Sequence, residues 1–361
     1  MSTVKRRDLI QRLQDIRGSR VVCLVLADRE TFPPGLPGFS VALSPDIQMW
    51  LLDLLRGIGH VPALDLVLYT RGGATETVWP MINDLRAQCD KLSVLVPFRA
   101  HSAGTMICLG ADEVVMSDSA ELSPIDPTTG NQFNPHDTAN PSNQLGISVE
   151  DVTSYFGFAH EVAGISSESA TLEVFKQLMS TAPTVHPLAL GNVYRQSRLT
   201  ERLASELLAL HLERNDDRFK EIAASFTTGF YSHLHTISRK EAQSLLGDSW
   251  VRAPNADEAT AMDALFAAFA EDLYLRDRFN LPDEFGDELR KDITAIGGFL
   301  ESDALSFVHV TRLRMAQRPQ FPPGVQVQVP PGQQIPLAPW ATRTFDWSPT
   351  AIGWVVNNEG A

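Results

Sequence analysis

Two stretches of this sequence decide its fold: residues 64–74 read LDLVLYTRGGA, and residues 92–104 read LSVLVPFRAHSAG. Each is an apolar strand pattern that runs into a loop of small residues, and a helical pattern at residues 76–88 lies between them. A β-α-β unit has this arrangement, and it brings both loops to one edge of a parallel sheet. Ligand sites in open α/β sheets lie at that edge. We therefore expect the two loops to face one cleft.

The loop residues are suited to acyl-transfer chemistry. The paired glycines Gly72 and Gly73 let the backbone turn its N–H groups outward without steric cost. Ser102 stands at a strand-to-helix turn, which holds a hydroxyl clear of the backbone. The simpler interpretations are a plain turn at the glycines and a helix N-cap at Ser102. Because both features follow predicted strands, we interpret them together as an oxyanion hole beside a nucleophile.

The alternation of strand and helix patterns continues on both sides of these loops. Residues 20–27 form a nearly continuous apolar run, which is typical of a strand buried on both faces. Helical patterns at residues 46–58 and 105–111 and a short strand at residues 113–116 complete a layered α/β domain. Residues 127–148 are rich in Pro, Asn, Thr and Gly. They predict a long loop, which is either a lid over the cleft or a surface excursion without a role.

The second half of the chain is of a different kind. Residues 167–269 are helical in pattern, and Ser238 with Glu241 predicts a capping box. Residues 317–340 hold many prolines around an alternating Val-Gln segment, which predicts an extended or hairpin-like arm. We predict a catalytic core at residues 1–165, a helical region that completes the site at 166–275, and a C-terminal extension with a Pro-rich arm at 276–361.

Composition limits the functional classes. The chain has 361 residues and a net charge of −14, which argues against binding a phosphate backbone or an anionic membrane surface. The first 20 residues lack the apolar core of a signal peptide, and no window approaches a membrane span, so we expect a cytoplasmic protein. No cofactor or metal site is indicated. Three cysteines in apolar or helical stretches predict reduced, buried thiols: Cys23, Cys89 and Cys108.

Four motifs resemble one family as a set. In chain order they are YTRGGA at residues 69–74, AHSAGT at 100–105, ADE at 111–113 and LSPIDP at 122–127. They resemble the serine dehydrogenase proteinase family, a distant relative of the Clp proteolytic subunit and the signal peptide peptidase A group. The resemblance covers about residues 20–250. It implies a Clp/crotonase-type fold, a layered β-α-β spiral, with catalytic residues in the order Ser, Asp, His.

A serine hydroxyl needs a base, and here the base is expected to be a histidine. After Lys91 the next lysine is Lys176, in a helical segment, which disfavours the lysine base of the signal peptide peptidase relatives. The segment YSHLHTI at residues 231–237 partly resembles the family's histidine segment, and His233 matches its histidine. His235, His136 and His186 stay open as alternatives, and either His233 or His235 could instead be an exposed residue before a helix. His101, next to Ser102, is expected to line the cleft.

The acidic member and the oxyanion donors follow from the same resemblance. Asp126 in LSPIDP matches the family's acidic residue, although an Asp between prolines is otherwise a common turn residue. There it would orient the imidazole and stabilise its cationic form. The backbone N–H groups of Gly73 and Ala103 would hold the oxyanion.

We therefore expect a serine peptidase that cuts peptides or unfolded protein inside a homo-oligomer. One alternative is a crotonase-type acyl-thioester enzyme, for which we see no basic cluster near Arg71 to bind coenzyme A. Another is an inactive scaffold that lost its base. An α/β-hydrolase is disfavoured because Ala100 stands where its motif requires Gly. No Walker-type motif is present, so an ATP-driven unfoldase would have to be a partner protein.

Overall fold

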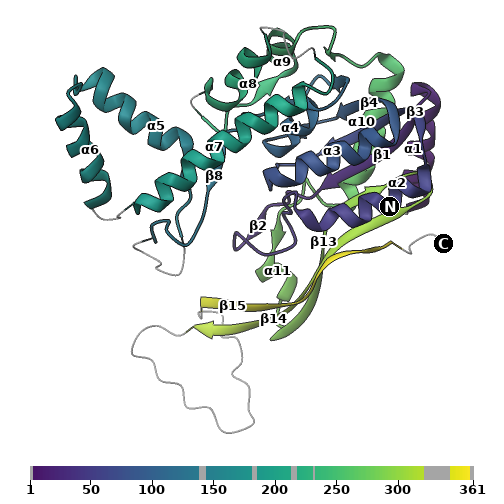
Figure 1. Cartoon of the computed structure of the whole chain (residues 1–361). Coiled ribbons are helices and arrows are strands. Elements are labelled where there is room, and N and C mark those ends of the chain that lie inside the picture. The colour runs from purple at the N-terminus through teal and green to yellow at the C-terminus, as the bar shows by residue number, and fades with distance from the viewer. Residues whose placement is uncertain are drawn as a thin grey trace, which may run out of the picture. The chain divides into compact units, whose positions relative to one another are not determined.

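The computed structural model describes residues 3–137, 144–180, 185–212, 218–230, 232–320 and 342–357 (Figure 1). The chain divides into two compact units, which are described separately below. The first contains Met1–Pro97 and Pro254–Ala361, and the second contains Phe98–Ala253. The second unit holds Ser102, Asp126 and His233.

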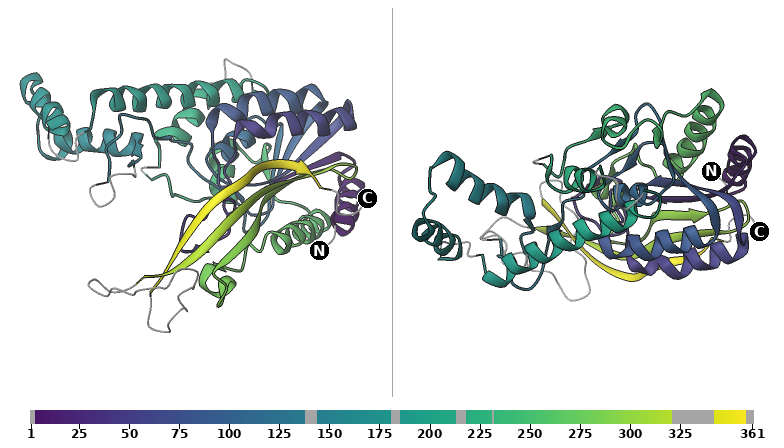
Figure 2. Two further views of the ribbon diagram at one scale, coloured as in Figure 1. Left: turned by 90° about the horizontal axis from the view of Figure 1, so that it is seen from below. Right: turned by 45° about the horizontal axis from the view of Figure 1, so that its top comes forward.

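The first unit is built on the parallel strands predicted from the sequence. β1 pairs in parallel with β3, and β3 pairs in parallel with β4, so β3 lies between the other two. Helices α2 and α3 cover one face of this sheet, and α1 and α10 lie on the other (Figure 2). The central positions of the strands are buried, which confirms the predicted doubly covered sheet. The bounds are α1 Thr3–Arg17, β1 Arg20–Leu26, β2 Thr31–Phe32, η1 Pro45–Ile47, α2 Gln48–Ile58, β3 Val61–Tyr69, η2 Thr75–Thr77, α3 Val78–Ala87, β4 Cys89–Val96 and α10 Ala256–Asp272.

Three long antiparallel strands, which were not predicted from the sequence, extend this sheet. β13 pairs with the free side of β1, β14 pairs with β13, and β15 pairs with β14. The region predicted as a C-terminal extension from residue 276 onward therefore contributes to the sheet of the first unit. Most of the predicted arm, residues 321–341, lies outside the described residues. The bounds are β12 Phe279–Asn280, α11 Leu281–Phe285, β13 Arg290–Glu301, β14 Ser306–Gln320 and β15 Thr342–Val356.

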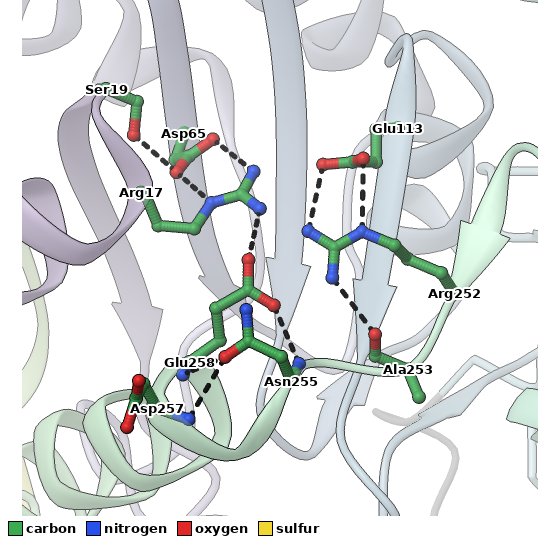
Figure 3. Close-up of polar contacts among 9 residues, drawn as sticks. All are labelled: Arg17, Ser19, Asp65, Glu113, Arg252, Ala253, Asn255, Asp257 and Glu258. Carbon is green, nitrogen blue, oxygen red and sulfur yellow. Dashed lines mark hydrogen bonds and ion pairs between the residues drawn. The ribbon is translucent and has the colours of Figure 1, made fainter.

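A buried ionic network ties α1, β3 and α10 together (Figure 3). Arg17 donates from Nε and Nη2 to the two carboxylate oxygens of Asp65, at 2.7 and 3.0 Å, and from Nη1 to Glu258 Oε1 at 2.7 Å. Glu258 also closes the capping box of α10 with Asn255. The side chains of Arg17, Asp65 and Glu258 are 9%, 1% and 6% exposed. Removing one partner from such a buried ion pair leaves an uncompensated charge in the interior, which strongly destabilises the fold.

Asp65→Ala is expected to destabilise the first unit by about 3–5 kcal/mol, because it leaves the Arg17 guanidinium buried without its main counter-charge. Chemical denaturation monitored by circular dichroism measures this loss. The matched control is Arg314→Ala, which removes a 3.6 Å pair with Asp292 whose side chains are 71% and 78% exposed. That variant should change the unfolding free energy by less than about 1 kcal/mol. Equal effects of the two substitutions would contradict this account.

The second unit carries short strands and a group of helices. β11 pairs in parallel with β6, and Arg252 donates from Nε to Glu113 Oε1 at 3.1 Å beside this pair (Figure 3). The long helix α7 packs against α4 and α8. The bounds are β5 Arg99–Ala100, α4 Ala103–Leu109, β6 Glu113–Met116, β7 Glu121–Leu122, β8 Thr128–Thr129, β9 Ile147–Ser148, α5 Val149–Gly157, η3 Phe158–Val162, α6 Glu168–Ser180, α7 Pro187–Leu208, α8 Arg218–Thr228, β10 Ile237–Ser238, α9 Arg239–Leu246 and β11 Val251–Arg252.

Candidate active site

A three-stranded sheet in the second unit gathers the Ser, Asp and His segments. Its order is β10-β7-β5, with β7 parallel to β5 and antiparallel to β10. Ala100, at the end of β5, lies opposite Leu122 at the end of β7, and Ile237, at the start of β10, lies opposite the same Leu122. The chain therefore leaves β5 toward Ser102, leaves β7 toward Asp126 and enters β10 from His233 at one end of the sheet.

Ser102 occupies the turn between β5 and α4 in a strained conformation. Its φ is 49° and its ψ is −112°, which is uncommon for a residue with a Cβ. It stands at the N-cap position of α4, yet its side chain makes no capping hydrogen bond. The structure therefore does not support the simpler interpretation that this serine is a helix cap. All seven residues of α4 behind it are buried. Strain of this kind is typical of functional turns, including the strand-to-helix turn that presents a nucleophilic serine.

Two further hydroxyl groups, which were not predicted as site residues from the sequence, hold this turn in place. Ser123 accepts a hydrogen bond from the Ser102 backbone N–H at 2.7 Å. Thr105 Oγ1 in turn accepts from the Ser123 N–H at 3.0 Å and donates to the Ala100 carbonyl at 2.8 Å. The sequence does carry a signal for these residues, because Thr105 lies within the motif AHSAGT and Ser123 within LSPIDP. The two motifs are thus joined through buried hydroxyl groups.

Asp126 and His233 form a hydrogen-bonded pair. The Nδ1 atom of His233 lies 3.0 Å from Asp126 Oδ1, although 107 positions separate the two residues. The Asp126 side chain is 2% exposed and that of His233 is 36% exposed. The hydrogen bond to Asp126 raises the pKa of His233, while partial burial of the ring acts in the opposite direction. An imidazole that donates from Nδ1 to a carboxylate carries its lone pair on Nε2, the form that a general base requires.

His235 is engaged elsewhere. Its Nε2 atom lies 3.0 Å from Glu241 Oε1, and its ring stacks on Phe230 with 4.7 Å between centroids. This contact also modifies the predicted capping box of α9. Ser238 does accept from the Glu241 N–H, but the Glu241 carboxylate binds His235.

The remaining histidine candidates also have identifiable surroundings. His186 caps α7, where its Nδ1 accepts from the Leu188 N–H at 3.1 Å. His136 is exposed and forms an isolated bridge with Gln144. His101, next to the nucleophile candidate, has its Nε2 3.1 Å from Glu121 Oε1. Of the histidines considered, His233 is the one whose ring forms a hydrogen bond with Asp126.

The glycine pair belongs to the first unit, where its backbone pairs with Leu43. The Leu43 N–H donates to the Gly72 carbonyl, and the Ala74 N–H donates to the Leu43 carbonyl, both at 2.8 Å. In this parallel bridge Gly73 turns its own N–H and C=O away from Leu43. A Cβ on Gly73 would lie 2.2 Å from the Leu43 carbonyl oxygen, so no side chain fits there. The Gly72 N–H donates to Thr70 Oγ1 at 3.0 Å, which leaves Gly73 as the donor of interest in this pair.

The segment after Asp126 contains two short paired strands. β8 pairs antiparallel with β9, directly before α5. Asn134 is buried and holds the turn, with its Oδ1 accepting from the Asn131 N–H and its Nδ2 donating to the Leu145 carbonyl. Burial, together with the nearby Asp126 charge, raises the pKa of Glu150 at the start of α5. Residues 138–143 of the predicted loop lie outside the described residues, so its role as a lid stays a prediction.

Metal and thiol chemistry find no support in the part of the chain that the structure describes. No group of three or more His, Cys, Asp or Glu side chains there could hold a metal ion. The three cysteines are free and buried, as predicted. Burial raises the pKa of the Cys108 thiol far above its ordinary value, which makes it a poor nucleophile. None of the described helices is long and apolar enough to span a membrane.

Comparisons with known proteins agree with the resemblance. The family described as ClpP-like SDH-type serine proteinase matches residues 1–140. Two uncharacterized proteins of Methanocaldococcus jannaschii are 29% and 28% identical to this chain over 128 and 130 residues. Each alignment covers 35% of this chain and 43% of the relative, so the match spans less than half of those proteins.

Among solved structures, two mutants of the membrane-bound stomatin-specific protease 1510-N are similar, one of them in complex with a substrate peptide. They are 15% and 16% identical, cover 60% of this chain and 73% and 76% of their own, and give TM-scores of 0.35 and 0.34. Scores this low do not by themselves establish a common fold. The parallel, helix-covered sheet confirms the predicted α/β class, and the family match over residues 1–140 agrees with it.

Proposed function

We propose that this chain, related through its residues 1–140 to the ClpP-like SDH-type serine proteinases, is a serine peptidase that hydrolyses peptides or unfolded protein. The observation that carries the proposal is the hydrogen bond between buried Asp126 and His233 at the end of the small sheet from which Ser102 also emerges. Cleavage of denatured, fluorescently labelled casein by the purified chain tests it. Absence of any cleavage across a broad panel of unfolded substrates would contradict it.

In the proposed reaction the Ser102 hydroxyl oxygen attacks the scissile carbonyl carbon, and His233 Nε2 takes the hydroxyl proton. Asp126 holds the Nδ1–H tautomer and stabilises the imidazolium that forms. His233 then gives its proton to the leaving amine as the C–N bond breaks. A water molecule, deprotonated by the same imidazole, hydrolyses the acyl-serine and releases the second product.

The negative oxygen of the tetrahedral intermediate needs hydrogen-bond donors, and we assign these to the backbone N–H groups of Gly73 and Ala103. Ala103 is the first residue of α4, where N–H groups have no intrahelical acceptor. The Gly73 N–H points away from Leu43. Loss of one such donor typically costs about 3–4 kcal/mol of transition-state stabilisation.

The rate is expected to depend on pH through His233. A base must be neutral, and the hydrogen bond to Asp126 raises the pKa of His233, so kcat/KM should rise with pH through a midpoint above the ordinary value of 6.5. Asp126→Asn removes the carboxylate and should move this midpoint to lower pH, while the maximal rate falls by roughly 10⁴-fold. A pH series on both proteins measures this. An unchanged midpoint in Asp126→Asn would show that Asp126 does not influence the pKa of the base, which would contradict the proposed pair.

We also propose that the protein works as a homo-oligomer, and that helices after Ser167 contribute to its contacts. Several large apolar side chains of the second unit are exposed, which is typical of interaction surfaces. The exposed fractions include 54% for Leu172 and 70% for Tyr194. The cytoplasmic location, the supply of substrate by an ATP-driven unfoldase and a contact through the Pro-rich arm stay predictions.

A further inference from the structure

The strand β15 forms the outer edge of the sheet in the first unit (Figure 2). Its inner side pairs with β14 along the whole strand, from Phe307 opposite Val356 to Gln320 opposite Thr342. No other strand of the described residues pairs with its outer side. A free edge of this length offers a row of backbone donors and acceptors to another strand, and proteins normally protect such edges.

Only the first half of β15 carries that protection. Arg343 and Asp346 place charges there, and Pro349 removes one backbone donor. A β-bulge follows, because Pro349 and Ala351 lie opposite the consecutive residues Leu313 and Arg312. The second half, Ala351–Val356, reads AIGWVV and contains neither a charge nor a proline.

The side chains of this unprotected half are apolar and largely open to solvent. Ile352 is 61% exposed, Val356 is 55% exposed and Val355 is 41% exposed. Ile352, Trp354 and Val356 lie on one face of the sheet, opposite Thr311, His309 and Phe307 of β14. Trp354 is buried within its own unit, and the exposed side chains of Ile352 and Val356 lie on either side of it along the strand.

We propose that this edge binds the same edge of a second copy of the chain, with Ile352–Val356 of the two copies pairing antiparallel about a two-fold axis. This rests on the homo-oligomer part of the proposed function and names one surface for it. A two-fold axis perpendicular to the sheet keeps each side chain on its own face, so opposed residues must face the same way and the axis lies midway between the two copies of one residue. Centring on Trp354 pairs Ile352–Val356 with itself and places Ala351 opposite Asn357 of the second copy.

This register is self-complementary. It places Ile352 opposite the second copy's Val356 and Gly353 opposite its Val355. A Cβ built on Gly353 meets no atom within 4 Å, so the space above this glycine can accept the valine side chain. The absence of charge matters too, because a chain with a net charge of −14 resists self-association wherever like charges meet.

The contact is small, which sets the expected affinity. It uses the five residues Ile352–Val356 from each copy, whereas stable interfaces use about 20–30 residues a side. The association through β15 should therefore depend on concentration in the micromolar range, with any contact through the helical region adding to it.

Light scattering of the full chain over a micromolar concentration series tests the proposal. The double variant I352K/V356K places lysines opposite lysines at both ends of the run, and its mass should fall to half that of the wild type. The variant I352E/V356E should behave in the same way. An equimolar mixture of the two variants should regain the wild-type mass, because each Lys then faces a Glu. The matched control T344K/S348K adds two charges to exposed positions in the protected half and should keep the wild-type mass.

The outcomes separate this inference from the proposed function. A wild type that is monomeric throughout the series contradicts both the homo-oligomer and this surface. The edge would then be open to pairing with a strand of a different protein. An oligomer whose mass is the same in I352K/V356K overturns the β15 surface alone. A loss of mass that the mixture with I352E/V356E does not restore also overturns it. Thermal melts that match the wild type show that the charged variants are folded.

Discussion

Ser102→Ala is expected to reduce peptide hydrolysis by roughly 10⁶-fold, because it removes the atom that attacks the substrate. Its melting temperature should stay close to that of the wild type, since the Ser102 side chain does not cap α4 and alanine fits the same turn. Ser102→Gly should be equally inactive but more stable than Ser102→Ala by about 1 kcal/mol, because glycine relieves the strain of a φ of 49°. Initial rates on a fluorogenic peptide and thermal denaturation measure the two effects.

A serine of the same unit provides the control for this result. Ser232 is exposed and close in sequence to His233, and Ser232→Ala should leave hydrolysis unchanged. Hydrolysis retained in purified Ser102→Ala, at a rate above that of a contaminant blank, would remove Ser102 from the mechanism. A glycine variant less stable than the alanine variant would instead show that the conformation at Ser102 is not strained.

His233→Ala should lower kcat by roughly 10⁴- to 10⁶-fold with little change in KM, because the base acts in the transition state and does not bind substrate. The neighbouring His235→Ala is the matched control. It removes an imidazole two residues away that binds Glu241 and Phe230, so its effect should be confined to a small loss of stability. Steady-state kinetics on both variants at a pH above the midpoint of the wild type measures the difference.

Two results would contradict the assignment of the base. One is a larger loss of kcat in His235→Ala than in His233→Ala. The other is a loss in His233→Ala that appears in KM alone, which would make this histidine part of substrate binding.

The sequence predicted the parallel part of the fold well and the antiparallel part poorly. Strands β1, β3 and β4 are buried on both faces, so their apolar runs are visible in the sequence without knowledge of their neighbours. β13 alternates exposed and buried residues in its first half and becomes continuously buried toward Glu301. Its pairing with β1 joins residues almost 280 positions apart, for instance Cys23 with Glu301. No local pattern specifies such a partner.

The candidate site could be proposed from the sequence as far as its motifs reach. Ser102 and Asp126 each lie just after a strand, within a short sequence motif. Such local motifs can be recognised without knowledge of the three-dimensional structure. The choice between His233 and His235 was different, because it depends on which carboxylate each ring meets in space. Glu241, read from the sequence as a capping-box residue, binds His235, while Asp126 reaches His233 from 107 positions away. Only the arrangement of β7 and β10 makes that distinction.

Covalent labelling by a fluorophosphonate probe tests the central claim most directly. The wild type, incubated with the probe above the pH midpoint of His233, should gain one adduct, and digestion with mass spectrometry should place it on Ser102. His233→Ala should react far more slowly, while His235→Ala should react like the wild type. An adduct on another serine, or no adduct in a preparation that hydrolyses peptides, would contradict the assignment of Ser102 as a nucleophile activated by His233.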